Sequence, residues 1–134
     1  MKKDNSFGDS LVVELMLKKS GNKLAAAKLD YKNKLYDDAV SRAYYAVYHC
    51  ISAMLISRGL HFFSHSQTIG AFNKNFVKTG FVPALFTKMI KKLFDARQVG
   101  DYDFETSIDQ EVAKECIANA EKIIDVCAKF IFGK

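Results

Sequence analysis

Three polar side chains follow one another along a stretch that is otherwise apolar, and together they could bind a phosphate and move a proton. They are Arg42, Tyr45 and His49, within DDAVSRAYYAVYHCISAMLISRG at residues 37–59. Arginine supplies a fixed positive charge, tyrosine a hydrogen-bond donor, and histidine a group that titrates near neutral pH. The alternative is a structural network, in which Arg42 pairs with a carboxylate on a neighbouring helix while Tyr45 and His49 lie in the core. The spacing leaves both interpretations open.

A second polar cluster lies in ARQVGDYD at residues 96–103, where an apolar helical pattern is expected to end. Arg97 precedes a glycine, and Asp101 and Tyr102 follow. A mixed polar cluster at a break between apolar helices is typical of a pocket rim. The alternative is that Arg97 caps the last carbonyl groups of its helix and pairs with Asp101.

Metal and disulfide chemistry have little support in the sequence. His61 and His65 are four residues apart, but they straddle an expected boundary between loop and helix, and no third ligand is near. The cysteines Cys50, Cys116 and Cys127 lie far apart in apolar patterns, which indicates reduced, buried thiols in a cytosolic protein. We therefore expect no metal and no cofactor.

Apolar residues recur with helical spacing along most of the chain, and no segment has the pattern of a strand. The expected helices cover about residues 10–33, 37–59, 65–78, 83–99 and 108–132, after a loose leader at 1–9. We expect Asp37 or Asp38 to cap the N-terminus of the helix at 37–59, and Gly59 to end it. The spacing of Ser64 to Gln67 and of Ser107 to Gln110 predicts capping boxes for the helices at 65–78 and 108–132, and Pro83 is expected in the first turn of the helix at 83–99.

The helix expected at 37–59 differs from the others because it has no charged face. Between Val40 and Ser57 its only formal charge is Arg42. A helix that is apolar nearly all the way round is usually central and packed on several sides. We therefore predict an all-α fold, an up-and-down bundle of four long helices plus one short helix, in a single domain over 1–134.

The net charge of +5 at pH 7 is unevenly distributed. Between residues 61 and 100 there is one acidic side chain, Asp95, and the basic side chains are Lys74, Lys78, Lys88, Lys91, Lys92 and Arg97. A basic surface favours a polyanion such as nucleic acid. The alternative, which composition favours, is a solvated face matched by the acidic C-terminal helix. The sequence has neither a secretory signal nor a membrane span, so we expect a cytoplasmic protein.

Three segments in order resemble the HEPN domain, named for higher eukaryotes and prokaryotes nucleotide-binding. They are SRAYYAVYH at 41–49, NKNFVKTG at 73–80 and KKLFDARQVGDYDF at 91–104. The resemblance covers about Leu11 to Phe130. It implies a bundle of four main helices plus a short one, usually dimeric and often encoded beside a minimal nucleotidyltransferase. Many members of that family are ribonucleases, and the pair can act as toxin and antitoxin.

The family's ribonuclease motif is an arginine followed a few residues later by a histidine, after the third main helix. Arg97 matches the arginine, but Asp101 and Tyr102 stand where the histidine is expected. An aspartate can orient a 2′-hydroxyl or bind a cation, yet it is a poorer general acid near neutral pH. The departure therefore favours binding over cleavage.

The resemblance implies a homodimer that is the nucleotide- or RNA-binding component of a toxin–antitoxin module. The first alternative is a metal-independent endoribonuclease with Arg97 and Asp101 as catalytic residues, and the second is a structural dimerisation module. We expect Arg42 to share a polar cleft with the remaining binding residues. The expected binding residues are Arg42, Tyr45, His49, Arg97 and Tyr102.

Overall fold

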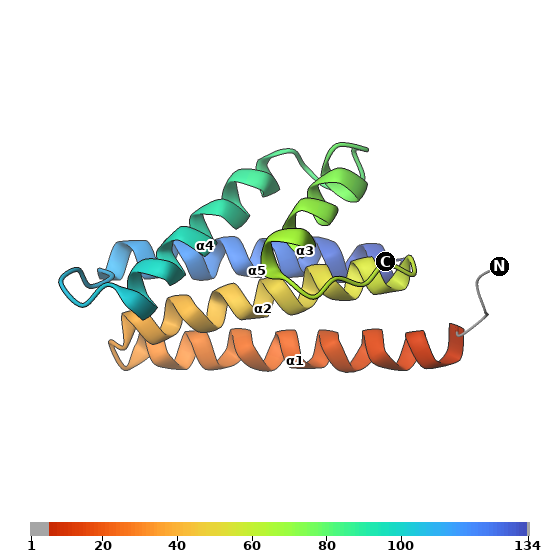
Figure 1. Ribbon diagram of the computed structural model, residues 1–134. Helices are drawn as coiled ribbons and strands as arrows, with labels where there is room; N and C mark the ends of the chain where they lie inside the picture. Colours follow the sequence, from red (N-terminus) through yellow and green to blue (C-terminus); the bar gives the residue numbers. More distant parts are fainter. Residues whose placement is uncertain (1–5, 134) are drawn as a thin grey trace.

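The computed structural model describes residues 6–133, and the side chains of 10–133 (Figure 1). Over this range the chain forms helices and no strand, which confirms the predicted all-α bundle of four long helices and one short one. The short helix α3 continues directly into a π-helical turn, η1. The elements are α1 (Ser6–Lys32), α2 (Tyr36–Ser57), α3 (His65–Phe72), η1 (Asn73–Val77), α4 (Leu85–Tyr102) and α5 (Gln110–Phe132).

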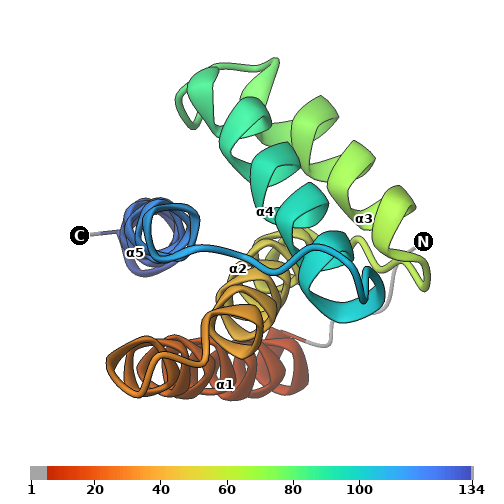
Figure 2. The ribbon, with the colours of Figure 1, turned by 90° about the vertical axis from the view of Figure 1, so that its left-hand side faces the viewer.

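Helix α2 occupies the centre of the bundle, as its lack of a charged face predicts. It contacts α1, α3, α4 and α5. Figure 2 shows α2 in the middle, with α1 below it, α5 on one side and the α3–α4 pair on the other. Half of its residues are buried, among them Tyr44, Val47, Ile51 and Leu55. Because α2 touches every other helix, its remaining polar side chains must lie at the seams between helices.

The N-termini of α1 and α2 both differ from the prediction. Helix α1 begins at Ser6, inside the segment expected to be a loose leader, while residues 1–5 lie outside the described part. The N-cap of α2 is Leu35, without a side-chain cap, so neither Asp37 nor Asp38 is the cap. Both lie in the first turn, where a carboxylate favours the positive end of the helix.

Helix α4 passes through Gly100, so the break predicted there is wrong. A side chain at Gly100 would lie 3.4 Å from Cα and from the carbonyl oxygen of Asp37, because α2 crosses α4 at this point. The glycine therefore permits a close approach of two helices and does not end one. As a consequence Arg97 and Asp101 are four residues apart on one helix and share a face.

Other helix ends follow simple capping rules. The Ser64 side chain accepts a hydrogen bond from the Gln67 amide at 3.0 Å, as predicted for α3. Helix α5 is capped by Asp109, whose carboxylate accepts from the Val112 amide at 2.9 Å, and not by Ser107. Helix α4 begins at Leu85, two residues after Pro83. None of the described helices is long and apolar enough to cross a membrane.

Candidate functional site

Arg97 lies in the second half of α4, and only 9% of it is exposed. One terminal nitrogen, Nη2, donates to the Tyr45 hydroxyl at 2.5 Å, and Nη1 donates to Gln98 Oε1 at 3.4 Å. Nε lies 3.3 Å from Asp101 Oδ2, within ion-pair distance but without hydrogen-bond geometry. Among the described residues this buried N–H therefore has no acceptor. A buried guanidinium with an unused donor is well suited to an anionic oxygen.

Aromatic rings surround the Arg97 guanidinium. Its central carbon lies 5.1 Å from the Tyr44 ring centre, 5.2 Å from that of Tyr45 and 5.8 Å from that of Tyr102. At these distances the negative ring faces attract the cation. Burial lowers the pKa of Arg97, but the hydrogen bond and the charge interaction with Tyr45 outweigh it, so the pKa is raised. The site therefore holds a permanent positive charge in a fixed position.

His65 joins this cluster from the first turn of α3. Its Nδ1 is 2.7 Å from the Tyr44 hydroxyl, and its ring stacks on Tyr48 with 4.0 Å between centres. Burial raises the pKa of Tyr44, so that hydroxyl stays protonated and donates to Nδ1. From this contact we assign the proton of neutral His65 to Nε2. Burial, followed by the nearby Arg97 charge, lowers the pKa of His65.

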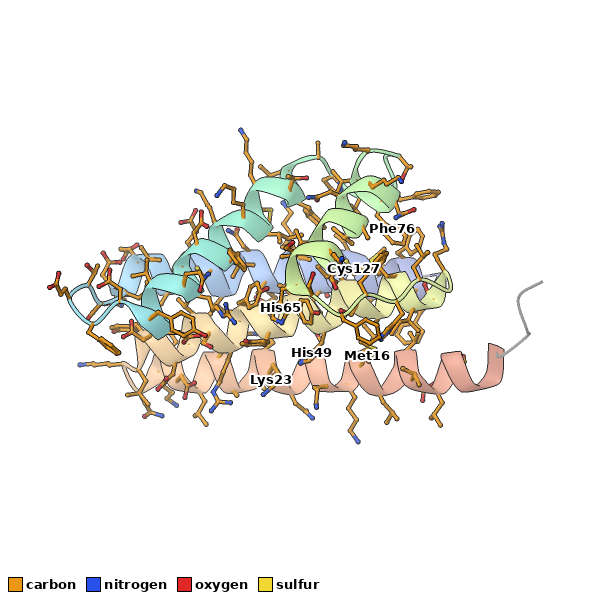
Figure 3. All side chains as sticks on the ribbon, viewed as in Figure 1. Met16, Lys23, His49, His65, Phe76 and Cys127 are labelled. Atoms are coloured by element: carbon orange, nitrogen blue, oxygen red, sulfur yellow. The ribbon has the colours of Figure 1, made fainter. Side chains whose placement is uncertain are left out.

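His49 lies on α2, one turn after Tyr45. Its ring centre is 6.4 Å from Tyr45 and 6.0 Å from Tyr48, so the two tyrosines lie between His49 and the rest of the cluster. Burial lowers the pKa of His49, and the charges of Lys19, Lys23 and His65 lower it further. Figure 3 shows His65, His49 and Lys23 close together on α3, α2 and α1.

The structure brings most of the predicted site residues together. Tyr45, Arg97, Asp101 and Tyr102 are in one cluster, with His49 beside Tyr45. Asp101 also accepts a hydrogen bond from Ser41 on α2 at 3.4 Å.

The expectation that Arg42 faces this cluster is wrong. Arg42 Nε lies 2.8 Å from Asp30 Oδ2, at the end of α1, and its side chain is 46% exposed. Successive residues on a helix point about 100° apart, so the neighbouring Ser41 faces α4 while Arg42 faces α1. Arg42 therefore pairs with a carboxylate on a neighbouring helix, as the structural interpretation of its position predicts.

The sequence did not single out His65 as a site residue. Its partners Tyr44 and Tyr48 lie about 20 residues upstream, so no local spacing could connect them. The available signal was its place directly after the Ser64 N-cap, because first-turn residues of a helix can reach a neighbouring site. No group of three metal-ligating side chains occurs within residues 10–133.

The basic section predicted between residues 61 and 100 is partly neutralised. Lys91 pairs with Asp95 at 2.9 Å, and Lys92 pairs with Glu115 of α5 at 3.2 Å. These exposed pairs favour the solvated-face alternative for the outer side of α4.

Comparison with known proteins gives one family and several relatives. Residues 13–130 match the family model of the HEPN domain. A protein of Thermotoga maritima named "UPF0332 protein" is 37% identical over 120 residues, which is 90% of this chain and 91% of the relative. Two proteins of Methanocaldococcus jannaschii are also similar. "Putative toxin MJ0605" is 33% identical over 84% of both chains, and "Putative toxin MJ0142" is 28% identical over 91% of this chain and 83% of its own.

Proposed function

Because the chain belongs to the HEPN domain family, we propose that it binds a nucleotide or RNA phosphate at Arg97 as part of a toxin–antitoxin module. Two relatives that are similar over most of their length carry the word toxin in their names. In this proposal the protein is a cytoplasmic homodimer, and a minimal nucleotidyltransferase is its partner. The binding residues are Tyr45, His49, Arg97 and Tyr102, with His65 added.

The observation that carries the proposal is the state of the Arg97 guanidinium. It is buried, held by the Tyr45 hydroxyl, and has one N–H without an acceptor in the described part. Burying a charge is costly unless its donors are used, so such a group is a poor choice for stability alone. A phosphate oxygen would use the free donor and would share the positive charge with Asp101, which lies 3.3 Å from Nε. The surrounding tyrosine rings would hold the guanidinium in place for that contact.

A second candidate function, metal-independent endoribonuclease activity, is favoured by two histidines: His65 is near Arg97, and His49 lies beside Tyr45. In that reaction the 2′-hydroxyl loses its proton to one neutral histidine, and its oxygen forms a bond to phosphorus. The bond to the 5′-oxygen breaks, and that oxygen takes a proton from the other histidine in its protonated form. Arg97 stabilises the charge on the phosphorane. The products are a 2′,3′-cyclic phosphate and a 5′-hydroxyl. In this mechanism His49 and His65 would take the role of the motif histidine, whose expected position is occupied by Asp101.

Thermal shift with nucleotides and short RNAs tests the binding proposal. Wild-type protein should be stabilised by ligand, and Arg97→Ala should not. Arg58→Ala is a matched control, because Arg58 also lies over aromatic rings, those of Phe76, Phe81 and Phe130, at 5.0–5.3 Å. The control should keep the ligand-induced shift. Equal shifts for wild type and Arg97→Ala, or none for either, would reject the proposal.

RNA cleavage is tested on the same proteins. Cleavage that is lost in Arg97→Ala and reduced in both His49→Ala and His65→Ala, with cyclic phosphate ends, would support the endoribonuclease. Binding without cleavage would reject the endoribonuclease and support the binding function.

A further inference from the structure

A small pocket of about 140 Å³ lies where α1, α2, α3 and the segment before α3 meet. Its apolar wall includes Met16 of α1 and Phe62 of the segment before α3. Figure 3 shows Met16 next to His49, across the seam between α1 and α2. Among the described residues, no aspartate, glutamate, lysine or arginine lines the pocket. It therefore suits an uncharged ligand with a flat apolar surface and polar edges. The polar lining comes from Tyr48, His49, Ser52, His61 and Thr68.

The pocket shares side chains with the cluster around Arg97. Tyr48 lines the pocket, and its ring stacks on that of His65 with 4.0 Å between centres. His49 also lines the pocket, and its ring centre is 6.4 Å from that of Tyr45. The Tyr45 hydroxyl in turn accepts the hydrogen bond from Arg97. The pocket and the cluster are therefore neighbours that are joined by aromatic contacts.

One face of α2 connects the pocket with the buried cation. Tyr45, His49 and Ser52 occupy positions i, i+4 and i+7 of this helix, so their side chains follow one another along one side. Tyr45 contacts Arg97, and Ser52 lines the pocket. At 1.5 Å per residue, Ser52 lies about 10 Å beyond Tyr45 along the helix axis. A ligand that lies along this face would thus place one end at a positive charge and the other in an uncharged pocket.

The volume of the pocket corresponds to one six-membered ring. A cavity of about 150 Å³ is known to accommodate benzene, whereas the two fused rings of a purine need more room. Rings of Tyr48, His49 and Phe62 contribute to the lining and can pack on the face of a flat ligand. The Ser52 hydroxyl and the His49 ring nitrogens form no hydrogen bond within residues 10–133, so they can donate to and accept from its polar edge.

We propose that this pocket binds the pyrimidine base of the nucleotide whose phosphate lies at Arg97. The inference rests on the proposed function and deepens it, because it names the class of nucleotide and the place of its base. A nucleotide has an anionic end and an uncharged ring joined by a sugar, which matches the cation and the pocket on one face of α2. A phosphate alone would not use the pocket, and a purely apolar molecule would not use its polar lining.

Isothermal titration calorimetry with UMP, AMP and ribose 5-phosphate tests the proposal. UMP should bind at least about tenfold more tightly than ribose 5-phosphate, which is the effect of one base stacked on aromatic side chains. AMP should bind more weakly than UMP because its base is too large. Ser52→Leu fills the pocket, so it should bind UMP as weakly as ribose 5-phosphate. The matched control is Ser57→Leu, the same change at an exposed position of α2 outside the pocket lining, and it should keep wild-type affinities.

A milder variant, Ser52→Cys, tests the pocket with almost no change in side-chain volume. The three native cysteines are buried, so a maleimide should react first with the introduced thiol. UMP should slow this reaction several-fold, and saturating ribose 5-phosphate should not. A uridine trinucleotide that binds more tightly than UMP and slows the reaction would identify the ligand as RNA, whereas equal affinities would identify a free nucleotide. The melting temperature of each variant shows that it folds.

Three outcomes would overturn the inference. If Arg97→Ala loses UMP and ribose 5-phosphate alike while Ser52→Leu binds UMP as wild type does, the pocket is rejected and the proposed function stands. If AMP binds as tightly as UMP and protects the Ser52→Cys thiol equally, the selection of a pyrimidine is rejected. If wild type binds neither nucleotide nor the trinucleotide, the proposed function fails and the pocket proposal fails with it.

Discussion

The Tyr45 hydroxyl and the Arg97 guanidinium lie 2.5 Å apart and join the centre of α2 to the second half of α4. The contact spans 52 residues of sequence. It fixes the one buried cation of the candidate site against the most central helix, so the geometry of the site depends on how these two helices pack.

Tyr45→Phe should lower both stability and ligand binding. The substitution removes the only short hydrogen bond of Arg97 within the described residues, and a hydrogen bond to a charged group contributes about 2 kcal/mol. Chemical denaturation should show a loss of that size, and ligand affinity should fall several-fold because the guanidinium is less well positioned. Tyr36→Phe is the control and should change neither. Unchanged affinity in Tyr45→Phe would mean that Tyr45 does not position Arg97.

Asp101→Asn should strengthen phosphate binding at some cost in stability, because it leaves the buried Arg97 charge without its carboxylate. The side chains of Arg97 and Asp101 are 11% and 28% exposed, and Nε lies 3.3 Å from Oδ2, so the loss should be about 1–3 kcal/mol. Removing its charge also removes repulsion of an incoming phosphate, which should raise affinity about threefold to tenfold. Asp95→Asn, which removes an exposed carboxylate paired with Lys91, is the control. Weaker binding in Asp101→Asn would instead indicate that Asp101 orients the ligand.

Arg42→Met should be tolerated by the fold. Its partner Asp30 is 17% exposed but Arg42 itself is 46% exposed, and such pairs contribute about 1 kcal/mol or less. Urea denaturation should therefore give a free energy of unfolding within about 1 kcal/mol of wild type. A loss above about 3 kcal/mol would show that the pair behaves as a buried one. Asp30→Asn provides the complementary measurement.

Much of the fold could be predicted because it depends on periodicity. The absence of a charged face was enough to place α2 at the centre, and the Ser64 cap was visible from its spacing to Gln67. The predicted break at Gly100 failed for a physical reason. A glycine in a helix can mark an end or a close approach, and only the position of Asp37 on another helix decides between them.

The candidate site was predictable only in part. Arg97, Asp101 and Tyr102 are neighbours in sequence, so their cluster could be found from one segment. The contribution of His65 depends on how α3 returns over α2, and the partner of Arg42 depends on which side of α2 is covered by α1. These are properties of helix packing, and helical periodicity alone does not determine them.

The two histidines of the site should make the protein less stable in mild acid. Burial is the main reason that the pKa values of His49 and His65 lie below the ordinary value. The charges of Lys19 and Lys23 lower the pKa of His49 further, and the charge of Arg97 lowers that of His65. The unfolded chain therefore takes up protons at a higher pH than the folded protein. The contribution of the two histidines to stability is greatest above about pH 6.5, and it is lost as the pH falls from there through their lowered pKa values in the folded protein.

Melting temperatures between about pH 7.5 and pH 5.5 would measure this loss. His49→Gln and His65→Gln should each lose less stability over that range than wild type, because the unfavourable protonation is removed. His61→Gln is the control, since His61 is exposed in the loop before α3, and it should follow wild type. Parallel curves for all four proteins would mean that other groups cause the acid sensitivity. A shallower curve for His65→Gln alone would assign the effect to the histidine beside Arg97.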